Sequence, residues 1–258
     1  MAYQKTRIIS LRLTDYSESS QVVAAFSRDF GRLSLLAKGS KRKSTRSHPA
    51  GAIDLFQLLD VVFLEKQGSA LSILTEYELA EGFLGLRKSL DRGYAALFMA
   101  ELILSLTEEH DPSPGVFDLA KDTLSALCTE KRPNVVLNAF EIRFLDLIGY
   151  APVLDRCASC GGELGDAARV AFAALSGGAV CKRCETSARE RVYVSRGALA
   201  VLHKLAASPS IRVARLRIDG RIAADVRSLL SHLWRHQMGR EPVMLRYVNP
   251  KVRNPKPE

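Results

Sequence analysis

The sequence is poor in aromatic residues, has a single tryptophan, and contains no long apolar run. Aromatic residues make up 7% of its 258 positions. No stretch of about 20 residues is apolar enough to cross a bilayer. No signal peptide is recognisable either, so we expect a cytosolic protein without membrane attachment, in a compartment where disulfides are rare.

Enzyme motifs are missing as well. The sequence contains no phosphate loop, no dinucleotide-binding fingerprint and no serine or cysteine nucleophile motif. His232 and His236 are four residues apart, but no acidic residue lies between them as a helical metal motif would need. We therefore expect a protein that is not an enzyme.

Positive charge is abundant but unevenly distributed. The formal net charge is +9, and residues 81–150 alone are acidic, with a net charge of −4. Residues 1–80 carry +3 and residues 151–258 carry +10. This distribution indicates an anionic partner, bound through the N-terminal or the C-terminal part of the chain.

Four of the five cysteines form two Cys-x-x-Cys knuckles with twenty residues between them, at Cys157/Cys160 and Cys181/Cys184. A two-residue gap lets both thiolates of a knuckle face one ion at about 2.3 Å, and a second knuckle completes a tetrahedron. Gly161 and Gly162 permit a sharp bend, and Lys182 and Arg183 should favour the thiolates. The pattern predicts a structural Zn²⁺ site, since four thiolates leave no open catalytic position.

Other interpretations of the cysteines explain less. Disulfides conflict with the expected cytosolic location. A redox dithiol accounts for one knuckle only, and buried free thiols do not explain the paired spacing. A site that has lost its metal stays open. The fifth cysteine, Cys128, ends a helical pattern and is expected to be an ordinary buried or half-buried thiol.

Five short apolar runs in the first 80 residues predict strands, separated by turns such as Asp29-Phe30-Gly31. Five strands in about 75 residues favour a small closed barrel over a sandwich. An oligonucleotide-binding (OB) barrel is the leading prediction, and an SH3-like barrel is the alternative. The predicted strands are residues 3–14, 22–28, 32–37, 54–65 and 70–77.

A basic loop, residues 38–48, follows the third predicted strand. Five of the nine residues from Lys38 to Arg46 are basic and none is acidic. Such a run can follow a phosphate backbone, although a solvated flexible loop is the plain alternative. Predicted DNA contacts, assigned by charge, are Arg32, Lys38, Lys41, Arg42, Lys43 and Arg46 here, and Arg212, Arg215 and Arg217 near the C-terminus.

Proteins that bind single strands also stack bases on aromatic side chains. Most aromatic residues of the first 80 lie inside apolar strands and are predicted to be core. Tyr16 and Phe30 flank turns and are the candidates for stacking.

The rest of the chain is predicted to be helical, with helices before and after the cysteine knuckles in sequence. Pro114 and Pro133 start two of them, and Ser195 and Asp219 are predicted N-caps of two more. Apolar residues at helical spacing, including Trp234, are predicted core. The predicted helices are residues 92–109, 114–128, 133–148, 196–205 and 220–238, and the tail from residue 249 is expected to be disordered.

The order of these elements resembles the RecO family of bacterial DNA-repair proteins over nearly the whole chain. The most specific pieces are residues 35–43, His110-Asp111-Pro112, and residues 140–152 leading into Cys157. The resemblance implies an α+β fold: an N-terminal five-stranded OB barrel at 1–80, then an all-helical domain at 81–258. It also implies an inserted zinc-finger-like module at about 153–192, held by the four cysteines.

Family resemblance further implies a recombination mediator in the bacterial cytoplasm, at the nucleoid. Such a protein binds single- and double-stranded DNA, anneals complementary strands, contacts the C-terminal tail of the single-strand-binding protein SSB, and acts with RecR to load RecA. We expect the SSB tail to dock in the helical part, near Arg87, Arg132 or Arg143. The alternatives are a zinc-containing transcription or RNA-binding factor, and a structural partner-binding subunit.

Overall fold

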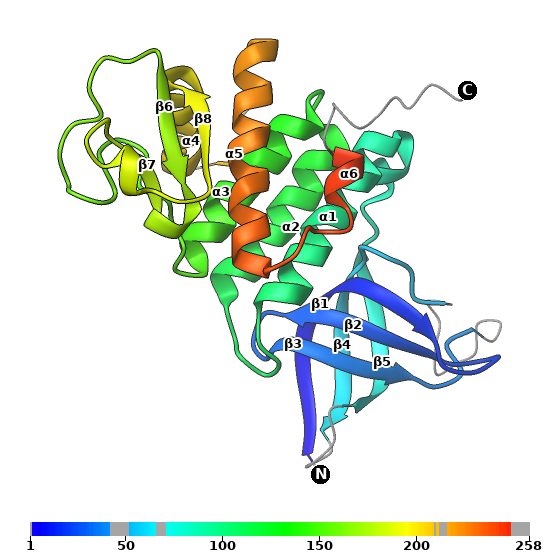
Figure 1. The fold of residues 1–258 in the computed structure, drawn as a ribbon. Coiled ribbons are helices and arrows are strands. Elements are labelled where there is room, and N and C mark those ends of the chain that lie inside the picture. Colours follow the sequence, from blue (N-terminus) through cyan, green and yellow to red (C-terminus); the bar gives the residue numbers. More distant parts are fainter. Residues whose placement is uncertain (1, 42–51, 66–70, 209, 212–215, 249–258) are drawn as a thin grey trace, which may run out of the picture. The chain divides into compact units, whose positions relative to one another are not determined.

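The computed structural model describes residues 2–41, 52–65, 71–208, 210–211 and 216–248 (Figure 1). The chain divides into two compact units, residues 1–128 and 129–258. The division predicted near residue 80 lies at the end of the last barrel strand, whereas the first unit also contains two helices. No helix among the described residues is long and apolar enough to span a membrane.

Five strands of the first unit form a closed barrel in the order β1-β2-β3-β5-β4, and β4 pairs back with β1. The β3–β5 pair is parallel, and all other neighbours are antiparallel. This Greek-key arrangement is the predicted OB fold. The strands are β1 (Ala2–Asp15), β2 (Gln21–Ser27), β3 (Gly31–Ala37), β4 (Leu58–Glu65) and β5 (Ser72–Glu81).

The barrel interior follows the alternation of its strands. Val23 and Ala25 of β2 and Leu33 and Leu35 of β3 point inward and belong to one buried cluster. Phe63 of β4 is fully buried in the same cluster. Because every second residue of these strands is apolar and buried, the pairing register is strongly specified.

The fourth strand begins at Leu58, so its predicted start at Asp54 is wrong. Phe56 has a positive φ of 59°, which is incompatible with an extended strand. Its amide donates to the Ser10 carbonyl, and the Ser10 amide donates to the Gln57 carbonyl. The apolar run Leu55-Phe56 looks like a strand in sequence, but its backbone turns to meet β1.

Two helices complete the first unit, α1 (Leu90–Leu106) and α2 (Pro114–Thr129), after a short 3-10 turn η1 (Leu84–Lys88). Ser89 caps α1 by accepting from the Arg92 amide, so the helix starts two residues before its predicted start. Pro114 begins α2 as predicted.

The connection between α1 and α2 lies against β3. The His110 amide donates to the Arg32 carbonyl at 3.1 Å. Gly31 has a φ of +64°, and a Cβ at this position would lie 2.0 Å from the Asp111 carbonyl oxygen. Only glycine permits this close approach, which fixes the helical segment to the barrel within the first unit.

The second unit contains the predicted helices with the predicted caps. The Ser195 side chain accepts from the Ala198 amide, and Asp219 accepts from the Arg221 amide. Gly239 ends α5 in the left-handed conformation. The helices are α3 (Pro133–Leu147), α4 (Arg196–Ala207), α5 (Gly220–Met238) and the short α6 (Leu245–Val248).

A three-stranded antiparallel sheet in the order β7-β6-β8 separates α3 from α4 in sequence, and the sequence analysis missed it. Its strands are only three to five residues long, too short for a periodic signal. They are β6 (Arg169–Ala173), β7 (Gly178–Val180) and β8 (Arg191–Ser195), with 3-10 turns η2 (Ala174–Ser176) and η3 (Glu185–Ser187).

A buried ion pair joins α3 to α5. Both carboxylate oxygens of Glu141 accept from the Arg227 guanidinium, at 2.7 and 2.5 Å. The indole N–H of Trp234 donates to Glu141 Oε2 at 2.6 Å. Glu141 is fully buried, and its charge is held by three hydrogen bonds, as a buried carboxylate requires.

Candidate metal centre and nucleic-acid interface

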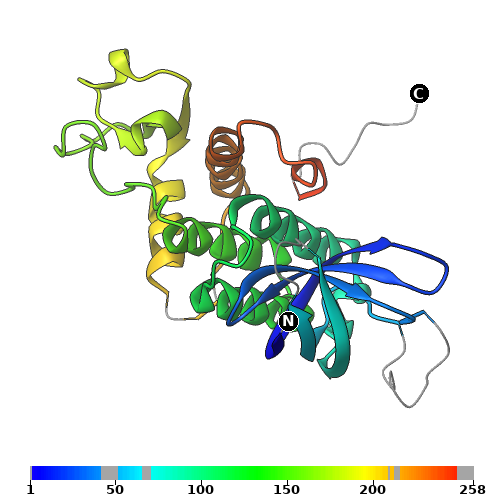
Figure 2. The same ribbon diagram turned by 90° about the horizontal axis from the view of Figure 1, so that it is seen from below.

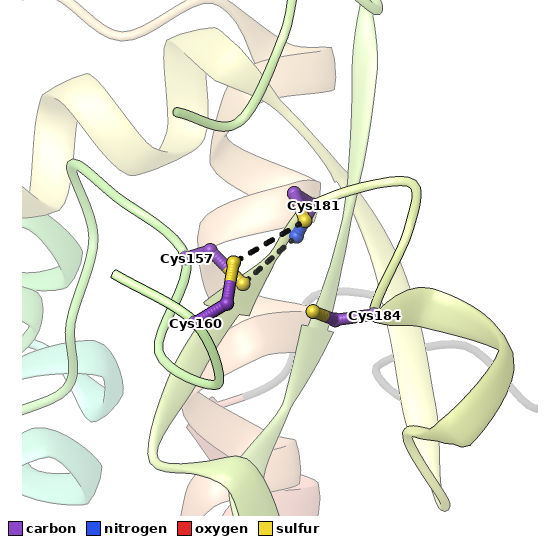
Figure 3. A group of neighbouring side chains, drawn as sticks. All are labelled: Cys157, Cys160, Cys181 and Cys184. Carbon is purple, nitrogen blue, oxygen red and sulfur yellow. Dashed lines mark hydrogen bonds between the residues drawn. The ribbon is translucent and has the colours of Figure 1, made fainter. Parts of the chain in front are cut away.

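The four knuckle cysteines converge in the second unit (Figure 3). Their sulfur atoms all lie within 4.8 Å of one another. The Sγ atoms of Cys160 and Cys181 are 3.8 Å apart. A tetrahedron with metal–sulfur bonds of about 2.3 Å has an edge of about 3.8 Å, so the spacing fits a four-thiolate metal site.

Backbone hydrogen bonds from both sides of the cluster shape it. The first knuckle is fastened to β7, because the Ala158 amide donates to the Ala179 carbonyl at 2.8 Å. The second knuckle follows directly from the end of β7 at Val180. In the first knuckle, Gly161 has a φ of +72°, which confirms the predicted bend. The strand that sequence analysis missed is therefore what brings the two knuckles together.

The apolar core around the cysteines is small. It consists of Ala171, Ala173, Val180 and Ala188 with the buried thiols of Cys157 and Cys181. Alanine side chains bury little area, so hydrophobic burial alone stabilises this module weakly. A metal bound by the four thiolates would supply the missing folding free energy.

Electrostatics within the cluster favour two thiolates and oppose a third. Burial acts against the charged form of Cys157, but the backbone amides of Cys181, Cys160 and Ser159 lower its pKa to about 6. The Cys184 amide lowers the pKa of Cys181. The Cys160 and Cys181 side chains instead raise the pKa of Cys184 to about 12. A divalent cation removes this mutual repulsion, which fits the donor set to Zn²⁺.

Of the two cations of the second knuckle, Lys182 is 88% exposed and pairs with Glu185 at 3.4 Å. The groups that lower the pKa of Cys157 and Cys181 are mainly backbone amides, with further hydrogen bonds from the Cys160 and Cys184 side chains. Cys128 lies in the other unit, half-buried, with its Sγ 3.4 Å from the Phe83 carbonyl, as expected of an ordinary thiol.

In the barrel, hydrogen bonds hold the start of the basic loop against the β1–β2 turn. The Lys41 amide donates to the Ser19 carbonyl at 3.1 Å, and the Gly39 amide donates to Ser20 Oγ at 3.3 Å. Lys41 Nζ also pairs with Asp15 at 2.5 Å. Sequence reasoning missed Asp15 and the polar turn. Asp15 ends the first strand, and only the barrel fold brings it next to the lysine-rich loop.

The predicted DNA contacts fall in different places. Lys38 is exposed beside the β1–β2 turn, and Lys41 is partly buried there. Arg217 is exposed in the second unit, ahead of α5. Lys38 and Lys41 belong to the first unit, and Arg217 belongs to the second. Arg42, Lys43, Arg46, Arg212 and Arg215 lie outside the described residues.

Arg32 has a structural role within the first unit. Its guanidinium donates to the Leu104 carbonyl at 2.6 Å, near the C-terminus of α1. Along β3 it lies about 20 Å from Lys38. Favourable charge at a helix C-terminus explains this arginine without nucleic acid.

The outer face of β2 and β3 is partly covered, near the turn that joins the two strands. Phe26 points away from the barrel core, yet it is fully buried. Arg28 pairs with Asp118 of α2 at 3.6 Å. OB folds commonly bind oligonucleotides on the strand 2–3 face and on neighbouring loops. Here the helical segment contacts the end of that face near the β2–β3 turn, and the described β1–β2 turn lies at the other end.

The two stacking candidates separate clearly. Phe30 packs on the barrel core and makes an edge-to-face contact with Phe63, with ring centroids 5.4 Å apart. Tyr16 is 63% exposed on the β1–β2 turn. Phe30 is therefore core, and Tyr16 alone of the two is accessible to a base.

The barrel and the cysteine cluster define the class of protein: an OB-fold protein whose helical unit carries a four-cysteine cluster that could hold a metal ion. Family models agree: the N-terminal model of recombination protein O matches residues 1–83, and its C-terminal model matches residues 87–246. Together they span both units.

Full-length relatives point the same way. A DNA repair protein RecO of Pelotomaculum thermopropionicum is 34% identical over 242 residues, covering 93% of this chain and 91% of the relative. The DNA repair protein RecO of Myxococcus xanthus is 34% identical over 230 residues, covering 89% of this chain and 90% of the relative. That of Rhodopirellula baltica is 32% identical over 212 residues, covering 82% of this chain and 78% of the relative. The chain belongs to the RecO family of DNA repair proteins.

Proposed function

We propose that this protein is a recombination mediator that binds single- and double-stranded DNA and anneals complementary strands. The observation that carries the proposal is the OB barrel with a lysine-rich loop rooted on its β1–β2 turn, in a chain of the RecO family. A barrel with an adjacent cationic segment suits a phosphate backbone of any sequence.

Annealing on this surface needs no catalytic group, and we propose that the protein is not an enzyme. Two phosphate backbones repel each other, and cationic side chains that neutralise them while the bases stay free speed pairing. Lys38 and Lys41 supply such charge among the described residues. Arg42, Lys43 and Arg46 continue the run in sequence, and Arg212, Arg215 and Arg217 are the second basic group.

Zn²⁺ is the proposed cofactor, held by Cys157, Cys160, Cys181 and Cys184. Four thiolates close the coordination sphere, so the ion would stabilise the module and leave no position for a substrate. The sulfur spacing and the small alanine-rich core support this role.

The proposed partners are the C-terminal tail of SSB and RecR, with which the protein would load RecA in the bacterial cytoplasm at the nucleoid. Of the three arginines considered for the tail, Arg87 borders a cavity of about 570 Å³ with apolar walls. Arg132 donates to the Leu216 carbonyl, and Arg143 is half-buried on α3. The cavity walls are formed by Leu55, Phe56, Phe83, Leu86, Tyr94 and Leu97.

A tail ending in acidic and aromatic residues fits this cavity by charge and polarity. Arg87 and Lys88 lie at its rim, and Arg87 pairs with Asp54, which an incoming carboxylate would replace. Arg87→Ala should weaken binding of a labelled tail peptide, while Arg7→Ala, which breaks another exposed pair, should not. Equal affinity of both variants would place the tail elsewhere.

The direct test of the function is annealing of complementary oligonucleotides coated with SSB, followed by electrophoresis. A recombination mediator anneals arbitrary sequences under these conditions. A transcription or RNA-binding factor that uses the same barrel would bind its preferred sequence and fail to anneal the others. A partner-binding subunit would show no salt-dependent affinity for DNA at all.

A further inference from the structure

Two turns at one end of the barrel form a single surface within the first unit. The β1–β2 turn, residues 16–20, closes on itself through the Tyr16 amide and the Ser20 carbonyl at 3.0 Å. The turn after β3, residues 38–41, is fastened to it by the two backbone donors Gly39 and Lys41. Figures 1 and 2 show the β1–β2 turn at the opposite end of β1 from the N-terminus.

Buried polar contacts hold the second turn in place. Ser40 is fully buried, and its hydroxyl lies 3.1 Å from both the Gln21 side-chain oxygen and the Ala37 carbonyl. Its position is thus set by β2 and β3, the rigid part of the barrel. Lys38, next to it, is exposed. The turn therefore presents its lysines from a fixed base.

Tyr16 lies on the β1–β2 turn, outside the buried cluster of the barrel. Its side chain is 63% exposed, and within the described part of the chain its hydroxyl has no hydrogen-bond partner. Exposed aromatic rings contribute little to folding, whereas every nucleobase offers a face that can stack on them. Tyr16 directly follows Asp15, whose carboxylate holds the Lys41 ammonium.

We propose that Tyr16 is a base-stacking residue for single-stranded nucleic acid, and that Lys38 and Lys41 hold the phosphates on either side of the stacked base. The proposal rests on the proposed function and assigns a subsite to it. The helical segment covers the β2–β3 face near the β2–β3 turn, whereas the β1–β2 turn at the other end of these strands is exposed among the described residues.

The Asp15 carboxylate competes with a phosphate for the Lys41 ammonium. A phosphate that approaches Lys41 must displace the Asp15 carboxylate, whose own exposed fraction is 76%. Asp15→Asn removes that competition and one repulsive charge, so it should raise the affinity for single strands. Weaker binding of this variant would count against the subsite.

The principal experiment is a salt titration of the full chain on a fluorescent oligo-dT and on a duplex. Tyr16→Ala should lower the affinity for the single strand roughly 5- to 150-fold, the range of a lost base stack. Affinity for the duplex should be unchanged, because paired bases do not offer their faces. The salt dependence should stay as in the wild type, since stacking releases no counterion.

Matched variants separate stacking from other effects. Tyr3→Ala removes a tyrosine that is 71% exposed at the far end of β1 and should bind as the wild type does. Tyr16→Phe and Tyr16→Trp should keep the single-strand affinity. Trp234 is fully buried, so quenching of the Tyr16→Trp emission by oligo-dT reports directly on contact at the turn.

The outcomes are distinct. If the wild type fails to bind oligo-dT, the proposed function itself is wrong. If the wild type binds and Tyr16→Ala binds equally well, only the stacking subsite is wrong. An equal loss on single strand and duplex also overturns the subsite, because it shows a backbone contact or a disturbed turn.

Discussion

At the scale of single residues, the thiols of the cysteine cluster differ in how strongly their surroundings favour the thiolate. Backbone amides favour thiolates at Cys157 and Cys181, and their neighbours oppose one at Cys184. A metal bound there would resolve this conflict and would crosslink residues 157–160 with residues 181–184.

We expect about one zinc per chain in protein purified without added metal. Cys157→Ser should reduce this content and lower the stability of the second unit, because binding free energy at such a site is folding free energy. Elemental analysis with thermal melts measures both. Cys128→Ser, which alters a thiol outside the cluster, is the control and should keep its metal. Four freely titratable thiols in the wild type would contradict the assignment.

The buried ion pair between α3 and α5 is the second prediction at this scale. Glu141→Gln keeps the shape but leaves the Arg227 charge without a counter-charge in the core, at an expected cost of about 3–5 kcal/mol. The control Glu241→Gln breaks an exposed pair with Arg235, which lies on α5 as Arg227 does. It should lower the free energy of unfolding by less than about 1 kcal/mol. Urea unfolding measures both, and similar midpoints would show that Glu141 is not held as a charge.

At the scale of elements, the basic loop should carry salt-dependent DNA affinity. Replacement of Lys41, Arg42 and Lys43 by Gln should weaken binding to all sequences about equally. It should flatten the slope of log affinity against log salt by roughly 2, at about 0.7 per phosphate contact on single strands. Because Lys41 is partly engaged by Asp15, its single replacement should change the slope least.

The measurement is a salt titration on fluorescent oligonucleotides, with thermal melts to check folding. The matched control is the replacement by Gln of two lysines outside the loop, the half-buried Lys121 and the exposed Lys131. An unchanged slope for the loop variant would move the DNA site to the arginines ahead of α5.

Sequence reasoning reached the elements whose signals are local. Ser195 and Asp219 were predicted N-caps and cap α4 and α5, and Pro133 starts α3 as predicted. Proline and side-chain caps act through neighbouring backbone groups, so a single sequence reveals them. The paired knuckle spacing likewise predicted the thiol cluster.

What sequence reasoning missed depends on partners far along the chain. Phe56 leaves the extended conformation because of β1, and the Arg32 guanidinium is taken by the α1 carbonyl of Leu104. The strands β6, β7 and β8 are defined by pairing with one another and are too short to show a period. Charge alone could not distinguish a nucleic-acid contact from a helix-capping arginine.

At the scale of the whole molecule, the metal should stabilise one part of the chain selectively. The cluster and its sheet lie within the second unit, whereas the OB barrel lies within the first. Metal removal with a chelator under reducing conditions should therefore raise amide exchange in residues 153–195 and leave the barrel strands protected. Hydrogen exchange read by mass spectrometry tests this, and equal loss of protection in the barrel would contradict it.

The strand order of the barrel also has a consequence for synthesis on the ribosome. β5 is the last barrel strand in sequence, yet it lies between β3 and β4. Until residue 81 has left the exit tunnel, β3 and β4 each present an unpaired edge, the kind of surface on which nascent chains aggregate. At about 5–20 residues per second, this exposure lasts seconds, and slower translation through residues 66–81 should increase aggregation of the newly made protein.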